Sequence, residues 1–366
     1  MKAVVVQENL KTALAIANRG VATSSTLPIL SNVLLKTEKG MLKISATNLE
    51  ISISQLVRCK VEKEGVVCLP ARLLSEIVNN LPNEPITLED GSDGLRLSVG
   101  KYKTVVKTVA AEDFPVLADT LPGKLVQFDT GALKKALEGV LFAVSTNETQ
   151  AELCGVNFSL GGGKLLLAGT DRYRLGESVV CLPKAPDGET FSVIVPARAV
   201  GEVIKSVANA GSGVAEIGVG DNQAVFIIGE TIITTRLVDG QYPEYEAIIP
   251  NEFSTTIVLN RTQFLAGLKA VSVFARGVSG VEFTYANDII TLAAKSQDAG
   301  EGTVEISARI EGSSDVILFN HKYLLDVLQY LTAENIEIKL NNPGSPVVFR
   351  GKEDPGYTYL VMPIKS

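Results

Sequence analysis

Residues 67–78 read Val67-Cys68-Leu69-Pro70-Ala71-Arg72-Leu73-Leu74-Ser75-Glu76-Ile77-Val78, and this stretch decides the fold because it occurs three times. It returns 126 residues later as Val193-Ile194-Val195-Pro196-Ala197-Arg198-Ala199-Val200-Gly201-Glu202-Val203-Ile204. A more divergent copy follows 124 residues after that, as Ile317-Leu318-Phe319-Asn320-His321-Lys322-Tyr323-Leu324-Leu325-Asp326-Val327-Leu328. Each copy has an apolar strand, a helix start, a cation in the first helical turn and an acid four residues later. A spacing close to a third of the 366 residues predicts three similar units.

The repeat extends to the rest of each third. Each third opens with a strand and an amphipathic helix, followed by a hairpin whose arms are separated by polar or glycine turns. We therefore predict an α+β fold of three tandem similar domains, each with two helices packed on antiparallel sheet. The six predicted helices cover residues 8–20, 70–81, 129–143, 196–207, 261–276 and 320–331, and the hairpins cover 32–45, 156–167 and 281–292.

Two short joints divide the chain. Leu121–Lys124 and Ile249–Glu252 each combine proline with turn-forming residues between apolar runs. They predict domains at 1–121, 122–250 and 251–366, each of an ordinary domain size. Joints this short also favour a fixed relative orientation of neighbouring domains.

Composition excludes several classes of protein. With 46% hydrophobic and 20% charged residues the chain can build real cores, so disorder is not expected. The N-terminal residues 1–7 form one apolar strand without the features of a signal peptide, and no apolar run is long enough to span a membrane, which favours the cytoplasm. The four cysteines have no Cys-x-x-Cys spacing, so we expect buried thiols rather than a metal site or disulfides: Cys59, Cys68, Cys154 and Cys181.

The sequence contains no group of residues that indicates a reaction centre. His321, the single histidine, stands where the sister copies have alanine, which predicts a surface histidine. Gly161–Lys164 lacks Walker spacing and reads as a hairpin turn, and Thr170–Arg174 has no nucleophile or base beside it. We predict no catalytic residue, no metal and no cofactor. An enzyme on a repeat scaffold and a pure protein-interaction scaffold remain as alternatives.

The predicted helices carry a net positive charge, and the rest of the chain carries a net negative charge. The chain carries a net charge of −7, yet the six helical windows hold eleven lysines and arginines against six acids. Helices tolerate glutamate as well as lysine, so helix propensity does not explain the sign. If the helices share a surface, that surface suits a polyanion, and without a base-reading motif the contact would ignore sequence. The cations expected to face it are Lys11, Arg72, Lys134, Lys135, Arg198, Lys205, Arg261, Lys269 and Lys322.

The whole chain resembles the family of bacterial DNA polymerase III beta sliding clamps. The resemblance rests on the three repeats and on five further blocks, which are Thr26–Asn32, Glu112–Pro115, Thr170–Leu175, Val238–Tyr245 and Tyr359–Ile364. It implies a head-to-tail homodimer that closes into a ring around double-stranded DNA, lined by helices and walled by sheet. The implied partners are the replicative polymerase, the clamp loader and other proteins with clamp-binding peptides, and no membrane.

The resemblance also implies a cleft between the second and third domains that captures short apolar peptides. Carried over position by position, the cleft would use Leu153, Thr170, Arg172, Arg174, Leu175, Pro243, Ile248, Val361, Met362, Pro363 and Ile364. Leu175, Ile248 and Val361 could also be ordinary core residues. Many family members have glycine in place of Arg172, and Thr23–Ser25 replaces a frequent arginine, so the peptide preference and one DNA contact are expected to differ.

A ring of two chains needs an interface between them, here called the seam. Two charged strands are suited to form it. Residues 101–107 carry Lys103, Val105 and Lys107 on one strand face, and residues 301–306 carry Glu301 and Glu305 at the same even spacing. Opposite charges would select the correct partner edge. The alternative is that both are solvated edges protected by charge.

Overall fold

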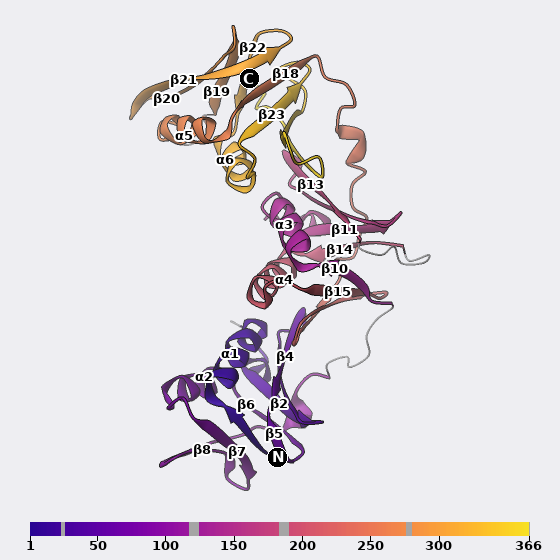
Figure 1. Ribbon diagram of the computed structural model, residues 1–366, viewed down its shortest axis with the longest axis vertical. Helices are drawn as coiled ribbons and strands as arrows, with labels where there is room; N and C mark the ends of the chain where they lie inside the picture. The colour runs from indigo at the N-terminus through magenta and orange to yellow at the C-terminus, as the bar shows by residue number, and fades with distance from the viewer. Residues whose placement is uncertain (23–25, 117–123, 183–189, 276–279, 366) are drawn as a thin grey trace. The chain divides into compact units, whose positions relative to one another are not determined.

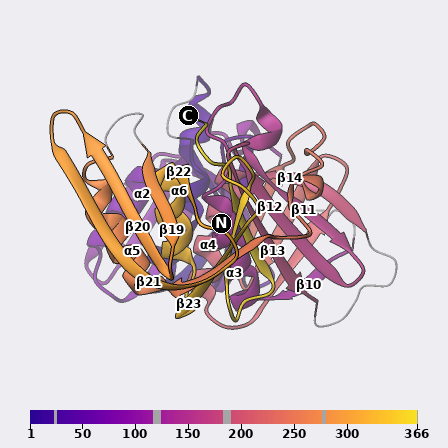
Figure 2. The ribbon, with the colours of Figure 1, turned by 90° about the horizontal axis from the view of Figure 1, so that it is seen from above.

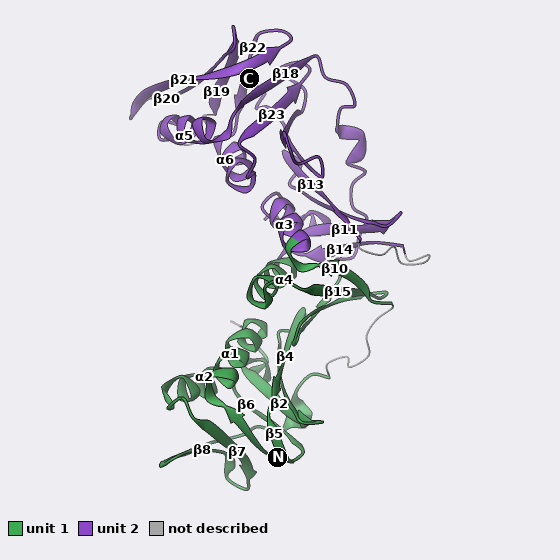
Figure 3. Cartoon of the chain, viewed as in Figure 1, with its two compact units in different colours: residues 1–131, 198–237 green, residues 132–197, 238–366 purple. Residues whose placement is uncertain are grey.

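The computed structural model describes residues 1–22, 26–116, 124–182, 190–275 and 280–365, and it has an α+β fold of six α-helices and antiparallel sheets within these ranges (Figure 1). Its contacts divide it into two compact units (Figure 3). One unit contains residues 1–131 and 198–237, and the other contains residues 132–197 and 238–366.

The order of elements repeats three times, as the sequence predicts. The first third runs β1 (Lys2–Val6), α1 (Gln7–Ala17), β2 (Asn32–Glu38), β3 (Met41–Thr47), β4 (Ile51–Arg58), β5 (Lys60–Lys63), β6 (Gly65–Pro70), α2 (Ala71–Asn80), β7 (Pro85–Gly91), β8 (Gly94–Val99) and β9 (Tyr102–Val106). The second runs β10 (Val126–Asp129), α3 (Thr130–Leu141), β11 (Gly155–Gly161), β12 (Lys164–Thr170), β13 (Arg174–Cys181), β14 (Phe191–Pro196), α4 (Ala197–Ala210), β15 (Val214–Val219), β16 (Gln223–Ile228) and β17 (Thr231–Arg236). The third runs β18 (Thr255–Asn260), α5 (Arg261–Ser272), β19 (Val281–Ala286), β20 (Ile289–Ser296), β21 (Gly300–Glu311), β22 (Asp315–Phe319), α6 (His321–Tyr330), β23 (Asn335–Leu340), β24 (Val347–Gly351) and β25 (Tyr357–Val361).

Two of the three sheets continue from one third of the sequence into the next. The eight-stranded sheet has the order β10-β15-β16-β17-β4-β3-β2-β6, so β17 of the second third pairs with β4 of the first. The twelve-stranded sheet has the order β14-β11-β12-β13-β25-β24-β23-β18-β21-β20-β19-β22, so β25 pairs with β13 in the same way. The remaining sheet has the order β5-β1-β7-β8-β9.

Apolar helix faces and strand alternation build the cores. In the first unit α1 packs against β3, β4 and α2, and it buries Leu10, Ala13, Leu14 and Ala17 at the predicted spacing. In the second unit α5 packs against β20, β21 and α6 around Phe264, Leu268 and Val271. Asn260 and Asn320 cap α5 and α6 because their side-chain oxygens accept backbone N–H groups in the first turn.

Local predictions agree closely with these elements. All six helices and all three hairpins are present, and Gly162 and Gly163 form the predicted turn with positive φ between β11 and β12. The helix predicted to reach residue 276 ends at Ser272. The joint at 121–124 lies outside the described residues except for Lys124. The prediction of buried cysteines is right for Cys68 but wrong for Cys181, which is exposed at the end of β13.

The two strands predicted to form a seam have open sides. β9 is one of the two edge strands of its sheet, and β5 is the other. β20 and β21 form a long hairpin beside β19 (Figure 2), and β21 pairs with β18 only through residues 308–311. Among the described residues, β21 therefore has β20 as its single strand partner over residues 300–307.

Candidate functional site

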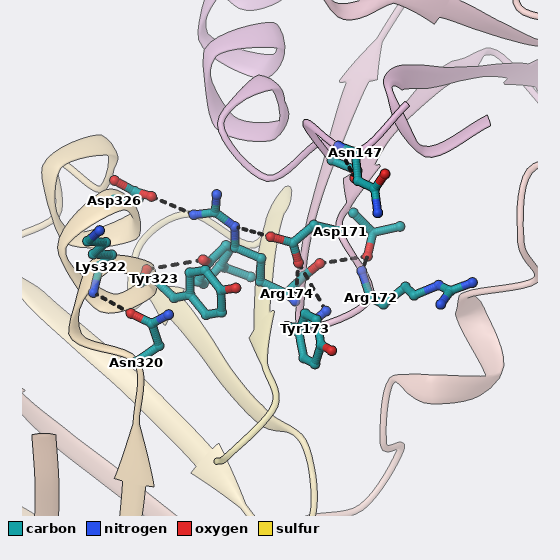
Figure 4. A network of polar contacts seen from close by, with 12 residues as sticks. Asn147, Asp171, Arg172, Tyr173, Arg174, Asn320, Lys322, Tyr323 and Asp326 are labelled. Carbon is teal, nitrogen blue, oxygen red and sulfur yellow. Dashed lines mark hydrogen bonds and ion pairs between the residues drawn. The ribbon is translucent and has the colours of Figure 1, made fainter. Parts of the chain in front are cut away.

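A groove of about 650 Å³ lies in the second unit, where three segments distant in sequence meet. The segments are the turn after β12, the start of α6 and the chain that follows β25. Figure 4 shows the labelled side chains of the first two segments around Arg174. The groove is lined by Arg172, Tyr173, Asn320, His321, Lys322, Tyr323, Met362, Pro363, Ile364 and Lys365.

Backbone hydrogen bonds fix the C-terminal segment along the groove. The N–H of Met362 donates to the carbonyl of Tyr173 at 2.8 Å, and the N–H of Ile364 donates to the carbonyl of Leu318 at 2.8 Å. The first bond ties the segment to the turn after β12, and the second ties it to β22. The apolar side chains of Met362, Pro363 and Ile364 therefore form one wall whose position is set by these backbone hydrogen bonds.

The turn after β12 is built by its own side chains. Asp171 Oδ1 accepts the N–H groups of Tyr173 and Arg174, each at 3.0 Å. Thr170 Oγ1 donates to the carbonyl of Arg174 at 2.6 Å and accepts the N–H of Arg172 at 3.1 Å. These bonds hold Arg172 at a φ of +77°, in the left-handed region that favours glycine.

Arg174 connects the turn to α6. Its Nε donates to Asp171 Oδ2 at 3.0 Å, and a second guanidinium nitrogen donates to Asp326 Oδ2 (Figure 4). The guanidinium carbon also lies 4.5 Å from the ring centroid of Tyr323 and 5.8 Å from that of Phe142. Burial opposes the charge, but Tyr359, Asp326 and Asp171 outweigh it and raise the pKa of Arg174 above its usual range. Arg174 therefore positions Tyr323 in the groove wall.

An apolar cluster lies beneath the C-terminal segment. It contains the buried residues Ala168, Leu175, Tyr245, Val348 and Leu360, with Met362 packed against it. Burial raises the pKa of Tyr245. Met362 belongs both to this cluster and to the groove lining, so the cluster supports the groove floor.

The eleven residues expected to form a cleft occupy different positions. Arg172, Met362, Pro363 and Ile364 line the groove. Thr170 and Arg174 lie in the turn and hold its shape. Leu153, Leu175 and Val361 are buried core residues, as the alternative reading of the last two allows. Pro243 and Ile248 lie exposed on the segment after β17, and Ile248 is 50% exposed.

Sequence reasoning missed six residues of the groove lining: Tyr173, Asn320, His321, Lys322, Tyr323 and Lys365. The sequence predicts that Lys322 faces DNA and that His321 lies on the surface. A signal was present, because the third repeat has His321, Lys322 and Tyr323 where the first has Ala71, Arg72 and Leu73. The pKa of His321 is lowered by partial burial and by the charge of Lys322.

The nine helix cations differ in whether they already have partners. Four of them pair with acids, namely Arg72 with Glu76, Lys134 with Glu138, Lys135 with Asp354 and Lys205 with Glu202. Arg261 donates to the carbonyl of Leu328 at 2.7 Å, near the C-terminal end of α6. Within the described ranges Lys11, Arg198, Lys269 and Lys322 form no ion pair, so these four are the cations freest to meet a phosphate.

The described residues contain no group of three or more histidine, cysteine, aspartate or glutamate side chains that could hold a metal ion. None of the helices in the described ranges is long and apolar enough to cross a membrane.

Comparison with known proteins gives the same family over the whole chain. Three family models match in order: the N-terminal, central and C-terminal domains of the DNA polymerase III beta subunit, at residues 1–118, 127–244 and 246–365. A beta sliding clamp from Synechococcus elongatus is 35% identical, with 100% of this chain and 99% of that protein covered.

Solved structures agree. The sliding clamp from Bacillus subtilis is similar with a TM-score of 0.95 at 26% identity, covering 100% of this chain and 99% of that one. A sliding clamp from Pseudomonas aeruginosa bound to griselimycin also gives 0.95 at 25% identity, with both chains fully covered.

Proposed function

This chain belongs to the DNA polymerase III beta subunit family and is a sliding clamp, a processivity factor that tethers the polymerase, and we propose that two copies close head to tail into a ring around duplex DNA. The observation that carries the ring is the strand pairing that joins successive thirds of the chain. We propose the domains 1–121, 122–250 and 251–366, supported by three family matches in tandem.

The strand pairs that join successive domains leave one strand with an open side in the first domain and one in the third. The last strand of the second domain, β17, pairs with β4 of the first domain, and β25 of the third pairs with β13 of the second. The equivalent strands that remain are β9 of the first domain and β21 of the third. Both have an open side among the described residues, so a second copy of the chain can complete each of them.

The internal joints also predict the register of this seam. In both, the first residue of the later strand faces the fifth residue of its partner: Thr231 faces Gln55, and Tyr357 faces Ser178. The equivalent pair is Tyr102 with Val304. Lys103 then lies opposite Thr303 with Glu301 and Glu305 on its diagonals, and Val105 lies opposite Glu301. Lys107 extends the same face of β9. The charges attract across the seam.

Apolar surface supports the same contact. A hollow of about 430 Å³ between α2 and β9 is lined in part by Leu73, Ile77 and Tyr102, and Leu73 and Tyr102 are exposed. In the second unit Phe142, just after α3, packs on Tyr330 of α6 with ring centroids 6.3 Å apart. By the repeat, Phe142 corresponds to Val273 and Tyr330 to Asn80, which lines the hollow. Val273 is 54% exposed, so we propose that it enters the hollow of the partner.

The helix cations give the DNA contact. Weak attraction of phosphates centres a duplex without base readout, and tight contacts would stop the ring from sliding. We propose that Lys11, Arg198, Lys269 and Lys322 carry most of it. The paired cations Arg72, Lys134, Lys135, Arg261 and Lys205 contribute less because acids or a carbonyl already bind them.

The groove gives the partner contact. Apolar walls suit leucine or phenylalanine anchors of an extended peptide, and the surrounding polar groups orient it. We propose that the polymerase, the clamp loader and other partners dock there, using the lining residues together with Pro243 and Ile248. The chain acts in the cytoplasm, where the polymerase works, and has no catalytic activity of its own.

The ring is tested by topology. The protein is loaded onto nicked circular DNA by a clamp loader, separated from free protein, and the circle is then cut once with a restriction enzyme. We expect retention on the circle and release from the linear DNA. Equal retention before and after the cut would contradict enclosure.

A further inference from the structure

Among the described residues, the groove lining carries three cations and no aspartate or glutamate. Arg172, Lys322 and Lys365 line it from three different segments, and no aspartate or glutamate is among the lining residues. Within the described ranges none of the three side chains has an ion-pair partner. This local charge contrasts with the net charge of −7 for the whole chain.

Two acids that adjoin the groove, Asp171 and Asp326, share one cation. Asp171 accepts the Nε of Arg174 and two backbone N–H groups, and Asp326 accepts the other end of the same guanidinium. Arg174 therefore offsets one of these two negative charges, so one negative charge stands against the three lining cations. The groove presents a net positive rim around apolar walls.

The positive side chains stand at opposite ends of the groove wall. Figure 4 shows Lys322 on one side and Arg172 on the other, with Tyr323 and Tyr173 between them. An extended peptide that seats its apolar side chains between the tyrosines and Met362 would reach one cation with each flank. Carboxylates on those flanks would gain charge-assisted contacts in a partly desolvated site.

The backbone of Arg172 adopts a conformation that favours glycine. With φ at +77° the position favours glycine, and an arginine there is strained. The turn bonds from Thr170 and Asp171 maintain this conformation whatever the side chain, so they do not require arginine. A charged side chain on this strained turn points to a role for its guanidinium in the groove.

We infer that this groove selects apolar peptides flanked by acidic residues, and that Arg172 and Lys322 are the residues that determine this specificity. The inference rests on the proposed peptide-binding function and adds the chemistry of the preferred partner. Lys365 contributes to the same field from the C-terminal segment.

The test compares three labelled peptides that share one leucine-phenylalanine core and differ only in the flanks, which are glutamate, glutamine or lysine. Their affinities for the full-length protein are measured by fluorescence anisotropy at low and high salt. We expect the glutamate peptide to bind about tenfold more tightly than the lysine peptide, because each exposed charge pair gives up to about fivefold. The difference is expected to shrink at high salt.

Variants assign the effect to its residues. Arg172→Gly and Lys322→Gln are each expected to lower the affinity for the glutamate peptide about threefold to fivefold and the affinity for the glutamine peptide by less, so that the ratio of the two affinities falls. Lys352→Gln, a matched change at an exposed lysine outside the lining, is expected to change neither. Thermal melting checks that each variant is folded.

The outcomes separate the two proposals. Equal binding of the three peptides to the unaltered protein, or an acid preference that survives both groove variants, would overturn the charge inference while leaving peptide binding intact. If none of the peptides binds the unaltered protein, the proposed peptide groove itself is contradicted.

Discussion

The same repeated acid has a different partner in the first and third copies. Glu76 binds its own Arg72 at 3.0 Å on the surface of α2, where the side chains are 60% and 94% exposed. Asp326 of α6 instead binds Arg174, which is 13% exposed and 152 residues earlier in the sequence. The third copy is docked on the preceding domain, whereas the acid of the first copy pairs within its own helix. The acid at the same repeat position therefore forms a surface ion pair in one copy and joins two domains in the other.

The second copy lies between these extremes. Glu202 binds Lys205 at 2.8 Å on its own helix and lies 3.9 Å from Arg19, which follows α1 of the first domain. Its side chain is 10% exposed. In the second and third copies the acid is thus turned toward the domain that comes before its own.

Removing the ion pair that Asp326 of the third copy forms with Arg174 should have the largest effect on stability. Arg174→Ala leaves Asp171 and Asp326 without their cation and removes the support of Tyr323, so we expect a loss of about 3 kcal/mol of unfolding free energy. Urea denaturation measures it. The matched change Arg72→Ala removes an exposed pair and should leave the midpoint unchanged. Equal effects of the two changes would contradict the comparison.

Changing the open strand edge should dissociate the proposed ring without unfolding the chain. Lys103→Glu combined with Lys107→Glu places like charges on the diagonals of Glu301 and Glu305, and we expect dimer affinity to fall at least tenfold. Sedimentation would then show the mass of one chain. A tight dimer in the doubly altered protein would eliminate this seam.

The register offers a sharper test of the same seam. A Lys103→Cys, Thr303→Cys protein should cross-link between copies under mild oxidation because those positions are predicted to face each other. The offset pair Lys103→Cys, Ser307→Cys should cross-link poorly, since it is four residues out of register on the same strand.

The effect of replacing a helix cation on DNA binding should depend on whether an acid already pairs with that cation. Replacing Lys11, Arg198, Lys269 and Lys322 by glutamine is expected to lower the salt dependence of DNA binding, by up to about 0.9 in slope for each lost phosphate contact. Replacing the acid-bound Lys134 and Lys135 should change the slope less. Titration of binding against salt concentration measures both, and equal slopes for the two proteins would contradict the division.

The strained turn should show a smaller change in stability. Arg172→Gly relieves a left-handed conformation, and we expect a gain of about 1 kcal/mol in unfolding free energy. Denaturant titration of this variant beside the unaltered chain measures the gain. A destabilised variant would mean that the arginine side chain supports the fold.

The smallest expected effect is a pH dependence from His321. Partial burial and Lys322 lower its pKa in the folded state, so the neutral form is favoured. Its contribution to stability is present above the ordinary pKa of 6.5 and is lost as the pH falls through the lower folded value. His321→Gln should flatten the melting temperature over this acid range. An unchanged pH profile would remove His321 as the source.

The groove shows where prediction from sequence stopped. Met362, Pro363 and Ile364 could be assigned to it through the family resemblance, and Arg172 through the same route. Tyr323 and His321 could not, because their place depends on α6 meeting the turn after β12. Leu175 and Val361 pair strands β13 and β25 and are buried there, so a resemblance in sequence could not separate their packing from binding.

The sequence by itself determined the three copies, the six helices and the hairpins, because apolar periodicity, turn residues and helix caps act over a few neighbouring residues. Only the tertiary structure decided what each repeated acid binds. Glu76, Glu202 and Asp326 have the same local surroundings, but their partners are brought to them by strand pairs such as β13 with β25, which join residues far apart in the chain. Partner choice follows from that long-range pairing and from the burial it creates.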